Sequence, residues 1–191
     1  FSLFTFDKDF TGKFQKVFFV ESSFLKSNFS DKNIKVAANL TDVSARADII
    51  TAFEVLDREF DPADFIEKVG KLCSRGTLFL LTTNTISGFE YQVLGRYSPR
   101  LVVPDRLNLL SIEAVEKLLD KAGFGIVDLS TPGRLDVELV ANTLQENPTM
   151  EMPEFLRYFF QYRDEDTRES FQDFLQLSRL SSYLRVAAIK K

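Results

Sequence analysis

The chain has 191 residues, of which 45% are hydrophobic and 27% are charged, with a net charge of −4. This is the composition of an ordinary globular protein. Its acids and bases are interspersed, so it lacks the basic stripe that binds nucleic acid and the cationic face that binds an anionic membrane. The length suits one large domain, and we expect a single domain over residues 1–191.

The cysteine and histidine content narrows the chemistry further. The one cysteine, Cys73, cannot form an internal disulfide, which favours a reducing, cytoplasmic location. The sequence has no histidine, which excludes Ser-His and Cys-His catalysis and argues against a catalytic zinc site, so we expect no metal. No apolar run in the sequence reaches the length of a membrane span.

Short apolar runs alternate with longer periodic stretches along the chain, which is typical of βαβ units around a mainly parallel sheet. Each run ends on polar residues, as buried parallel strands do when they enter a loop. The expected strands, in chain order, are Val17–Val20, Ile34–Ala38, Asp48–Phe53, Thr77–Thr83, Gly125–Ser130 and Leu184–Ile189.

Two of the expected helices carry clear end signals. In Asp61–Leu72, Asp61 is a candidate N-cap and Pro62 suits the first turn. In Ser111–Ala122, Ser111 is the candidate cap, and the glycine that follows ends the helix. Two more helices are expected at Pro153–Tyr162 and Glu165–Ser178. The stretch Asn84–Asn108 shows little regular pattern, and a loop of this length in a compact domain is usually functional.

Ligands of open α/β sheets bind beyond the carboxyl ends of the strands, so residues that follow the expected strands are candidate site residues. Glu21 and Ser22 follow the first strand, and an acid in this position can accept hydrogen bonds from a ribose diol. A solvated acid at a strand end is an equally good interpretation of Glu21.

The glycine-rich loop that accompanies such an acid lies roughly 20 residues before it. Counting back from Glu21 reaches Phe1, and no such loop occurs in the chain. Either the loop lies upstream and Phe1–Phe14 is the helix that follows it, or Ser2–Phe6 is a first strand whose loop has degenerated. The spacing favours the first interpretation, so we expect a chain that is incomplete or degenerate at its N-terminus.

Several segments of the chain, in order, match motifs of one known protein family. Ile50–Pro62 (ITAFEVLDREFDP) is similar to a family segment that reads FEVLEH followed by D-P. Ser98–Ser111 (SPRLVVPDRLNLLS) is similar to one that ends in PPDHLNFFS, and Leu118–Phe124 (LLDKAGF) matches the common L-L-x-x-A-G-F helix end. Thr82–Gly95 is similar to the family segment that precedes the PPDHLNFFS one. In this order, the segments resemble class I S-adenosylmethionine-dependent methyltransferases of type 12 and related families. Further segments resemble a bacterial branch often found with polysaccharide biosynthesis: Val20–Ser23, Thr131–Val137 and Leu180–Lys190.

The resemblance implies an α/β, Rossmann-like methyltransferase fold with a mostly parallel sheet, helices on both faces and an antiparallel last strand. It implies S-adenosylmethionine as cofactor, with Glu21 and Ser22 at the ribose, Asn39 and Leu40 beside the adenine, and Phe53 and Glu54 on the methionine side. It also implies that Gly88–Asn108, within the irregular stretch, helps to enclose a small-molecule methyl acceptor. The polar candidates there are Tyr91, Tyr97, Asp105 and Asn108.

Three histidines that are usual in the family are replaced here by Arg58, Arg106 and Tyr183. These replacements remove the usual candidates for a general base, so the catalytic residues stay unknown. Methyl transfer does not require a histidine, because much of its acceleration can come from aligning the nucleophile with the methyl group, and a carboxylate or tyrosine can accept a proton.

Two functions therefore stay open at this stage. The first is a methyltransferase acting on a small-molecule or sugar-linked acceptor. The second is a catalytically inactive methyltransferase-like module that serves as a scaffold or partner subunit, with its partner surface on the Phe-rich helices near the C-terminus; an oligomer is also compatible with the sequence. A nicotinamide-dependent oxidoreductase is a weaker third interpretation, because it needs the same glycine loop and lacks a family resemblance.

Overall fold

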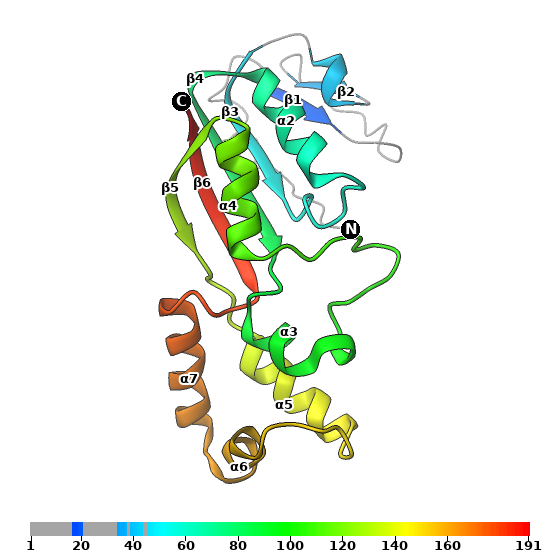
Figure 1. The fold of residues 1–191 in the computed structure, drawn as a ribbon, viewed down its shortest axis with the longest axis vertical. Helices are drawn as coiled ribbons and strands as arrows, with labels where there is room; N and C mark the ends of the chain where they lie inside the picture. Colours follow the sequence, from blue (N-terminus) through cyan, green and yellow to red (C-terminus); the bar gives the residue numbers. More distant parts are fainter. Residues whose placement is uncertain (1–16, 21–33, 38, 44–45) are drawn as a thin grey trace. The chain divides into compact units, whose positions relative to one another are not determined.

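The structure, a computed structural model, describes residues 17–20, 34–37, 39–43 and 46–191. The chain divides into two compact units, residues 1–46 and 47–191. In the first unit, strand β1 (Val17–Val20) pairs in parallel with β2 (Ile34–Ala37), with Val17 opposite Ile34. A single 3₁₀ turn, η1 (Leu40–Asp42), follows β2 (Figure 1). Both strands lie where the sequence predicts them.

The second unit is built on a four-stranded sheet in the order β3-β4-β6-β5. Its strands are β3 (Ala47–Phe53), β4 (Cys73–Asn84), β5 (Phe124–Ser130) and β6 (Tyr183–Lys190). β3 and β4 are parallel, whereas β6 is antiparallel to both of its neighbours, β4 and β5. The predicted Rossmann-like fold, with a mainly parallel sheet and an antiparallel last strand, is confirmed.

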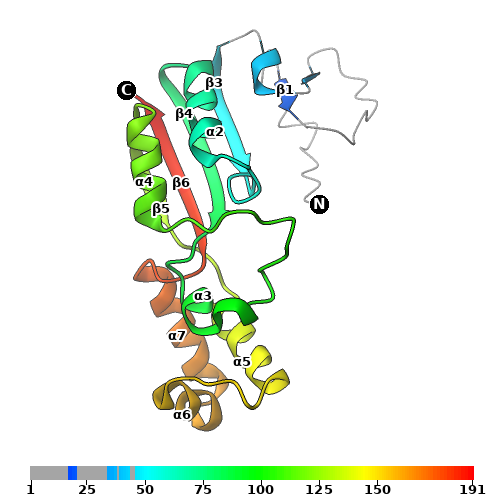
Figure 2. The same ribbon diagram turned by 45° about the vertical axis from the view of Figure 1, so that its right-hand side comes forward.

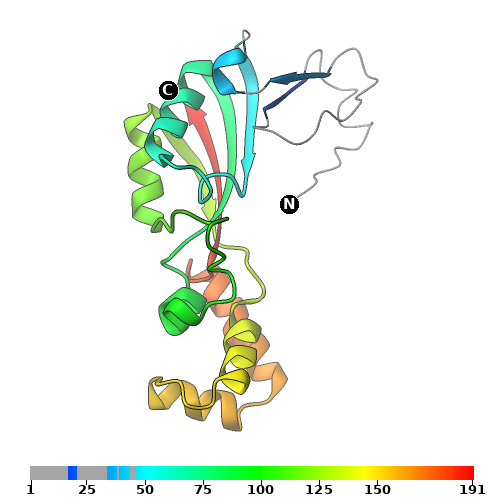
Figure 3. The same cartoon turned by 90° about the vertical axis from the view of Figure 1, so that its right-hand side faces the viewer.

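Helices α2 (Pro62–Leu72) and α4 (Ile112–Lys121) lie on the same side of this sheet, as the rotated view in Figure 3 shows. Each begins at the predicted cap: Asp61 accepts hydrogen bonds from the Ala63 and Asp64 amides, and Ser111 from the Ala114 amide. α4 ends before Gly123, whose φ of 78° lies in the left-handed region that glycine adopts without strain.

The core of the second unit forms where these helices meet the sheet. Val69 of α2 and Val115 and Leu119 of α4 are fully buried. On the sheet, Phe79 of β4 is also fully buried, and its ring lies 5.4 Å from that of Phe124 on β5. Alternate residues of β4 therefore face the helices, which leaves Leu78 and Leu80 on the opposite face.

A group of helices lies beyond the carboxyl ends of β3 and β4 (Figures 1 and 2). We call this group the cap; it consists of α3 (Phe89–Leu94), α5 (Asp136–Glu146), α6 (Glu154–Tyr162) and α7 (Glu165–Leu177). Its interior is aromatic: the Phe171 ring makes edge-on contacts with Phe89 and Phe159, at centroid distances of 5.1 Å each. Four phenylalanines, Phe89, Phe159, Phe160 and Phe171, thus pack against one another in the cap.

A buried carboxylate attaches the cap to the sheet. Asp136, at the start of α5, is fully buried and accepts hydrogen bonds from the Ser182 amide (2.6 Å) and the Ser181 hydroxyl (2.6 Å). Ser181 and Ser182 immediately precede β6. Ser182 also packs closely against Gly88, which precedes α3. A Cβ at Gly88 would lie 2.2 Å from the Ser182 Cα, so only glycine fits at this position.

Two predictions about the elements need correction. The stretch Asn84–Asn108, expected to be irregular, contains α3 and the 3₁₀ turn η2 (Gly95–Tyr97), and α5 was not predicted at all. α3 is only six residues long and carries a fully buried glutamate, Glu90, in place of an apolar residue. α5 lacks a side-chain N-cap and buries Asp136 and Thr143, so its sequence shows no clean apolar face.

Among the described residues, no helix has the length and apolar character needed to cross a lipid bilayer.

Replacing Phe79 by alanine should lower the free energy of unfolding by about 3–5 kcal/mol, because it removes a buried aromatic ring and leaves a cavity. The matched control is Phe155→Ala on α6, where the phenylalanine is 69% exposed and its removal should cost less than about 0.5 kcal/mol. Urea unfolding followed by circular dichroism measures both variants. Equal costs for the two would contradict this description of the core.

Candidate functional site

The turn after β3 adopts an unusual backbone conformation at the edge of the sheet where ligands bind in open α/β folds. Glu54 has a φ of 53°, a left-handed value that is uncommon for residues other than glycine. Its amide donates a hydrogen bond to the Thr82 carbonyl at 2.8 Å, which anchors it to β4. Backbone outliers of this kind gather at functional sites, where the surrounding structure maintains them.

A buried carboxylate lies next to this turn. Asp57 is 1% exposed, and its Oδ2 accepts a hydrogen bond from the Asn84 side chain at 2.9 Å and an ion-paired hydrogen bond from Arg106. Arg106 also lies 3.5 Å from the Glu54 carboxylate. The Asp57 carbonyl accepts the amides of Leu107 and Asn108, so both the side chain and the backbone of Asp57 hold the segment that contains Arg106.

Another arginine, Arg58, lies in the turn itself, and its ion pair is more exposed than that of Arg106. Arg58 donates to the Glu54 carbonyl at 3.2 Å and pairs with Asp105 at 3.0 Å. The Asn108 side chain donates to the Glu59 carbonyl at 2.5 Å. Arg58 and Arg106 therefore both contact Glu54 and fasten the 105–108 segment to the turn.

The polar network continues from Asn84 into the cap. Arg100 lies 3.5 Å from the Asn84 Oδ1 and pairs with the fully buried Glu90 of α3 at 3.2 Å. The Ser98 hydroxyl donates to the other carboxylate oxygen of Glu90 at 2.5 Å. Burial raises the pKa of Glu90, and the Ser98 hydrogen bond and the Arg100 charge oppose that rise.

Tyr91, adjacent to Glu90, has a hydroxyl without a hydrogen-bond partner among the described residues, although the side chain is only 4% exposed. Burial is the main cause that raises the pKa of Tyr91, and the negative charges of Glu90 and Glu54 raise it further. Tyr91 is therefore a neutral hydroxyl at physiological pH, and it can donate a hydrogen bond but is a poor base. A buried polar group without a partner is costly and suggests a ligand contact.

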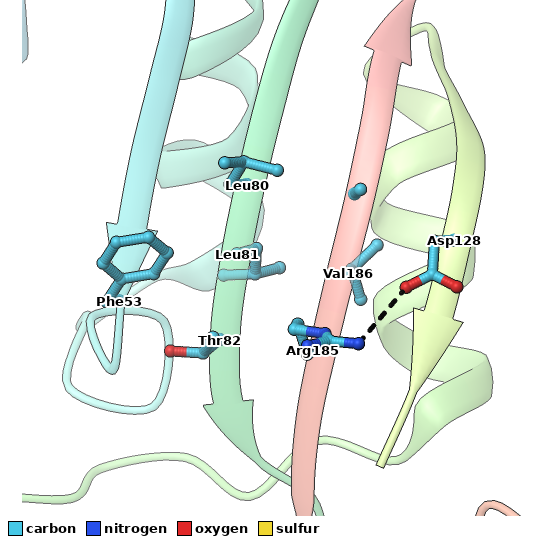
Figure 4. Close-up of a pocket in the computed structure, with 8 residues that line it drawn as sticks. Phe53, Leu80, Leu81, Thr82, Asp128, Arg185 and Val186 are labelled. Atoms are coloured by element: carbon cyan, nitrogen blue, oxygen red, sulfur yellow. Dashed lines mark ion pairs between the residues drawn. The ribbon is translucent and has the colours of Figure 1, made fainter. Parts of the chain in front are cut away.

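A shallow apolar cavity of about 230 Å³ lies on the sheet near the end of β3 (Figure 4). Phe53, Leu80 and Thr82 line it from β3 and β4. On its other side, Arg185 of β6 lies 3.9 Å from Asp128 of β5, and both side chains are more than half exposed. The cavity opens on the sheet face that points away from α2 and α4, because Leu80 alternates with the helix-facing Phe79 and Leu81.

The predicted site residues fall into three groups. Glu21 and Ser22 lie outside the described residues. Asn39 and Leu40 belong to the first unit, where the Asn39 amide donates to the Asp42 carboxylate at 3.0 Å and the Asn39 side chain is exposed. The other six lie in the second unit: Phe53, Glu54, Tyr91, Tyr97, Asp105 and Asn108.

Within the second unit, the structure brings Glu54, Asp105 and Asn108 together around the turn after β3. Tyr91 lies on α3, and no hydrogen bond connects its hydroxyl to this group. Tyr97 differs from the others, because it is 43% exposed and its hydroxyl accepts a hydrogen bond from its neighbour Arg96.

Sequence reasoning missed Asp57, Glu90 and Arg100 as members of this site. Asp57 and Arg106 are 49 positions apart, and no spacing rule connects them. Among the residues of this network, Asn84 could have been found from the sequence, because it directly follows the expected strand Thr77–Thr83. Within the described residues, no group of three or more potential metal ligands occurs.

These observations define the chain as a Rossmann-like α/β protein with its polar site at the carboxyl edge of the sheet. The sequence profile of the family described as "Methyltransferase domain" matches residues 6–129, which is more than half of the chain. The chain belongs to this methyltransferase domain family. No curated protein sequence matches it.

Solved structures with the same fold include YcgJ from Bacillus subtilis, which is 15% identical with a TM-score of 0.54, over 93% of this chain and 83% of that one. A putative methyltransferase from Haloferax volcanii, solved with the Trm112 methyltransferase activator, is 12% identical with a TM-score of 0.53, over 92% of this chain and 72% of that one. Both likenesses support the fold alone.

Other matched structures are longer than this chain. The chain spans 56% of the [4+2]-cyclase SpnF, with 15% identity and a TM-score of 0.46 over 83% of this chain. It spans 62% of the mycolic acid cyclopropane synthase CmaA1, which was solved with SAH and is 16% identical with a TM-score of 0.47 over 84% of this chain.

Replacing Arg106 by glutamine should destabilise the protein by about 3 kcal/mol, because it leaves the buried Asp57 carboxylate without a cation. The matched control is Arg58→Gln. Its partner Asp105 is half exposed, so that substitution should cost less than about 1 kcal/mol. Urea unfolding at neutral pH measures the difference. If Arg106→Gln is no more destabilising than Arg58→Gln, the Arg106–Asp57 pair does not hold the site together.

Proposed function

We propose that the chain is an S-adenosylmethionine-dependent methyltransferase that acts on a small-molecule or sugar-linked acceptor. Family membership supports the reaction class. The observation that carries the proposal is the left-handed Glu54 at the end of β3, fixed to β4 by its amide and contacted by Arg58 and Arg106. Such a turn keeps one partly exposed carboxylate at the edge of the sheet where ligands of this fold bind.

The described residues at this edge fit such a cofactor in charge and polarity. When bound, S-adenosylmethionine supplies a methyl group on a positively charged sulfonium. Glu54 offers a carboxylate that is 29% exposed and could attract a cationic group. Phe53, which directly precedes Glu54, lines an apolar cavity suited to the uncharged part of a ligand. We assign Glu21 and Ser22 to the ribose and Asn39 and Leu40 to the adenine, as the family resemblance implies.

On the acceptor side, Tyr91 is the strongest of the four candidates. Its buried hydroxyl lacks a partner, and a bound acceptor would provide one. Asp105 is half exposed and could also reach a ligand, whereas the Asn108 side chain already bonds the Glu59 carbonyl. Tyr97 is the most exposed candidate and would contact only the outer part of an acceptor.

Proton removal in this site would depend on a carboxylate. The sequence has no histidine, and the raised pKa of Tyr91 keeps its hydroxyl protonated. Glu54 and Asp105 are then the described groups that could accept a proton from an acceptor hydroxyl or amine. An acceptor that ionises easily would need little help beyond alignment with the methyl donor.

Four further parts of the proposal rest on the sequence. The acceptor is related to polysaccharide biosynthesis, as the branch resemblance implies. The protein works in the cytoplasm, in keeping with its one cysteine, which is buried. Residues 1–191 form one methyltransferase-like domain. The protein works with a small-molecule acceptor and with a second copy or a partner subunit, and binds neither nucleic acid nor membrane.

Titration calorimetry with S-adenosylhomocysteine tests the proposed cofactor. The full-length protein should bind it, and Glu21→Ala should weaken binding at least about tenfold, because a ribose diol would lose a charged hydrogen-bond acceptor. The control is Glu67→Ala, which removes an equal charge from the exposed face of α2 and should leave affinity unchanged. Absence of binding by the full-length protein would contradict the proposal and favour the inactive scaffold.

A further inference from the structure

A second cavity, of about 360 Å³, lies in the cap between α5 and α6, and α7 contributes to its wall. Its volume falls within the range of small-molecule sites in proteins, roughly 300–1,000 Å³. Its lining comes entirely from residues 141–168, so it is separate from the polar site around Glu54 and Asp57.

One part of the wall is apolar. Leu144, Met150, Met152 and Phe160 all line the cavity. Met150 is 8% exposed and belongs to the same buried cluster as Val140 of α5, which gives the apolar wall a fixed base. Methionine and phenylalanine side chains of this kind adapt to the apolar body of a ligand.

The other part of the wall is cationic. Arg157 and Arg168 both line the cavity, and none of the described lining residues is acidic. Arg157 has no ion-pair partner among the described residues. The cavity therefore carries a local positive charge in a protein whose net charge is −4.

The Arg168 side chain, on the cationic side of the cavity, is held in place by contacts within the cap. One of its terminal nitrogens donates to the Phe160 carbonyl at 2.7 Å, and its guanidinium lies over the Phe160 ring at 6.0 Å. Its Nε is buried and has no hydrogen-bond partner within the described residues. Its nearest carboxylate, on Glu165, is 3.9 Å away and belongs to a side chain that is 77% exposed, so that ion pair is weak.

We propose that this cavity binds a small oxyanion that carries an apolar body, such as a medium-chain carboxylate or an alkyl phosphate. The anionic group pairs with Arg157 and with the free donor of Arg168, because guanidinium groups match carboxylate and phosphate geometry. The apolar body lies against Leu144, Met152 and Phe160. This site goes beyond the proposed methyl transfer and does not depend on it.

The sequence offers a direct reporter of this cavity. Met150 and Met152 are the two methionines of the 191 residues, and both line it. In protein labelled with ¹³C at the methionine methyl groups, their NMR signals, assigned through Met150→Leu and Met152→Leu, respond to whatever enters the cavity.

We expect octanoate and octyl phosphate to shift both methionine signals in a saturable manner. The anion that binds with the higher affinity identifies the preferred anionic group. 1-Octanol, which has the same chain without the charge, should need about tenfold higher concentration, and acetate, which lacks the chain, should produce no shift. Failure of both octyl anions to shift the signals, or equal binding of octanol and octanoate, would overturn the proposal.

The variant Arg157→Gln should weaken octanoate binding about tenfold and leave octanol binding unchanged, because only the charged group contacts the guanidinium. Arg157 is exposed, so this substitution leaves the fold intact. Arg134→Gln, which removes an equal charge from an exposed position ahead of α5, is the matched control and should behave as the wild type. Unchanged octanoate affinity in Arg157→Gln would contradict the assigned contact.

Discussion

The arrangement of the site depends on one buried charge, the Asp57 carboxylate. A buried carboxylate is tolerated only when it is paired and hydrogen-bonded. Asn84 and Arg106 provide these contacts, and the Asp57 carbonyl holds the Leu107 and Asn108 amides as well. One residue therefore ties together the turn after β3, the end of β4 and the segment that returns from the cap. Because Arg106 also contacts Glu54, the same charge influences the residue that we place beside the cofactor.

The cap is joined to the sheet by a second set of buried polar contacts. Asp136 accepts hydrogen bonds from the residues before β6, and the Glu90–Arg100 pair connects α3 with Asn84. Tyr91, next to Glu90 on α3, has an unsatisfied hydroxyl. Polar networks of this kind are directional, so they set the position of the cap more narrowly than apolar packing of its phenylalanines would. The cavity proposed to bind an amphiphilic anion lies in the cap itself, apart from these connections.

Arg58 and Arg106, which the family resemblance aligns with histidines, have a structural role. Both serve as hydrogen-bond donors that hold the turn and the 105–108 segment. An arginine cannot act as a base, because it stays protonated in proteins. Because both side chains are permanent cations, we propose that a carboxylate accepts the proton where the methyl acceptor must lose one.

The sequence by itself determined the strands, the two capped helices α2 and α4, the fold class and the family, because these depend on local periodicity, cap residues and ordered motifs. The assignments of Glu21, Ser22, Asn39 and Leu40 stay predictions. Only the tertiary structure revealed α3, α5 and the Asp57 and Glu90 networks. Asp57 and Glu90 are buried acids whose partners are set by the fold: Arg106, 49 positions away, pairs with Asp57, and Arg100 pairs with Glu90. Local patterns cannot encode such pairings, because the contact exists only once the chain has folded.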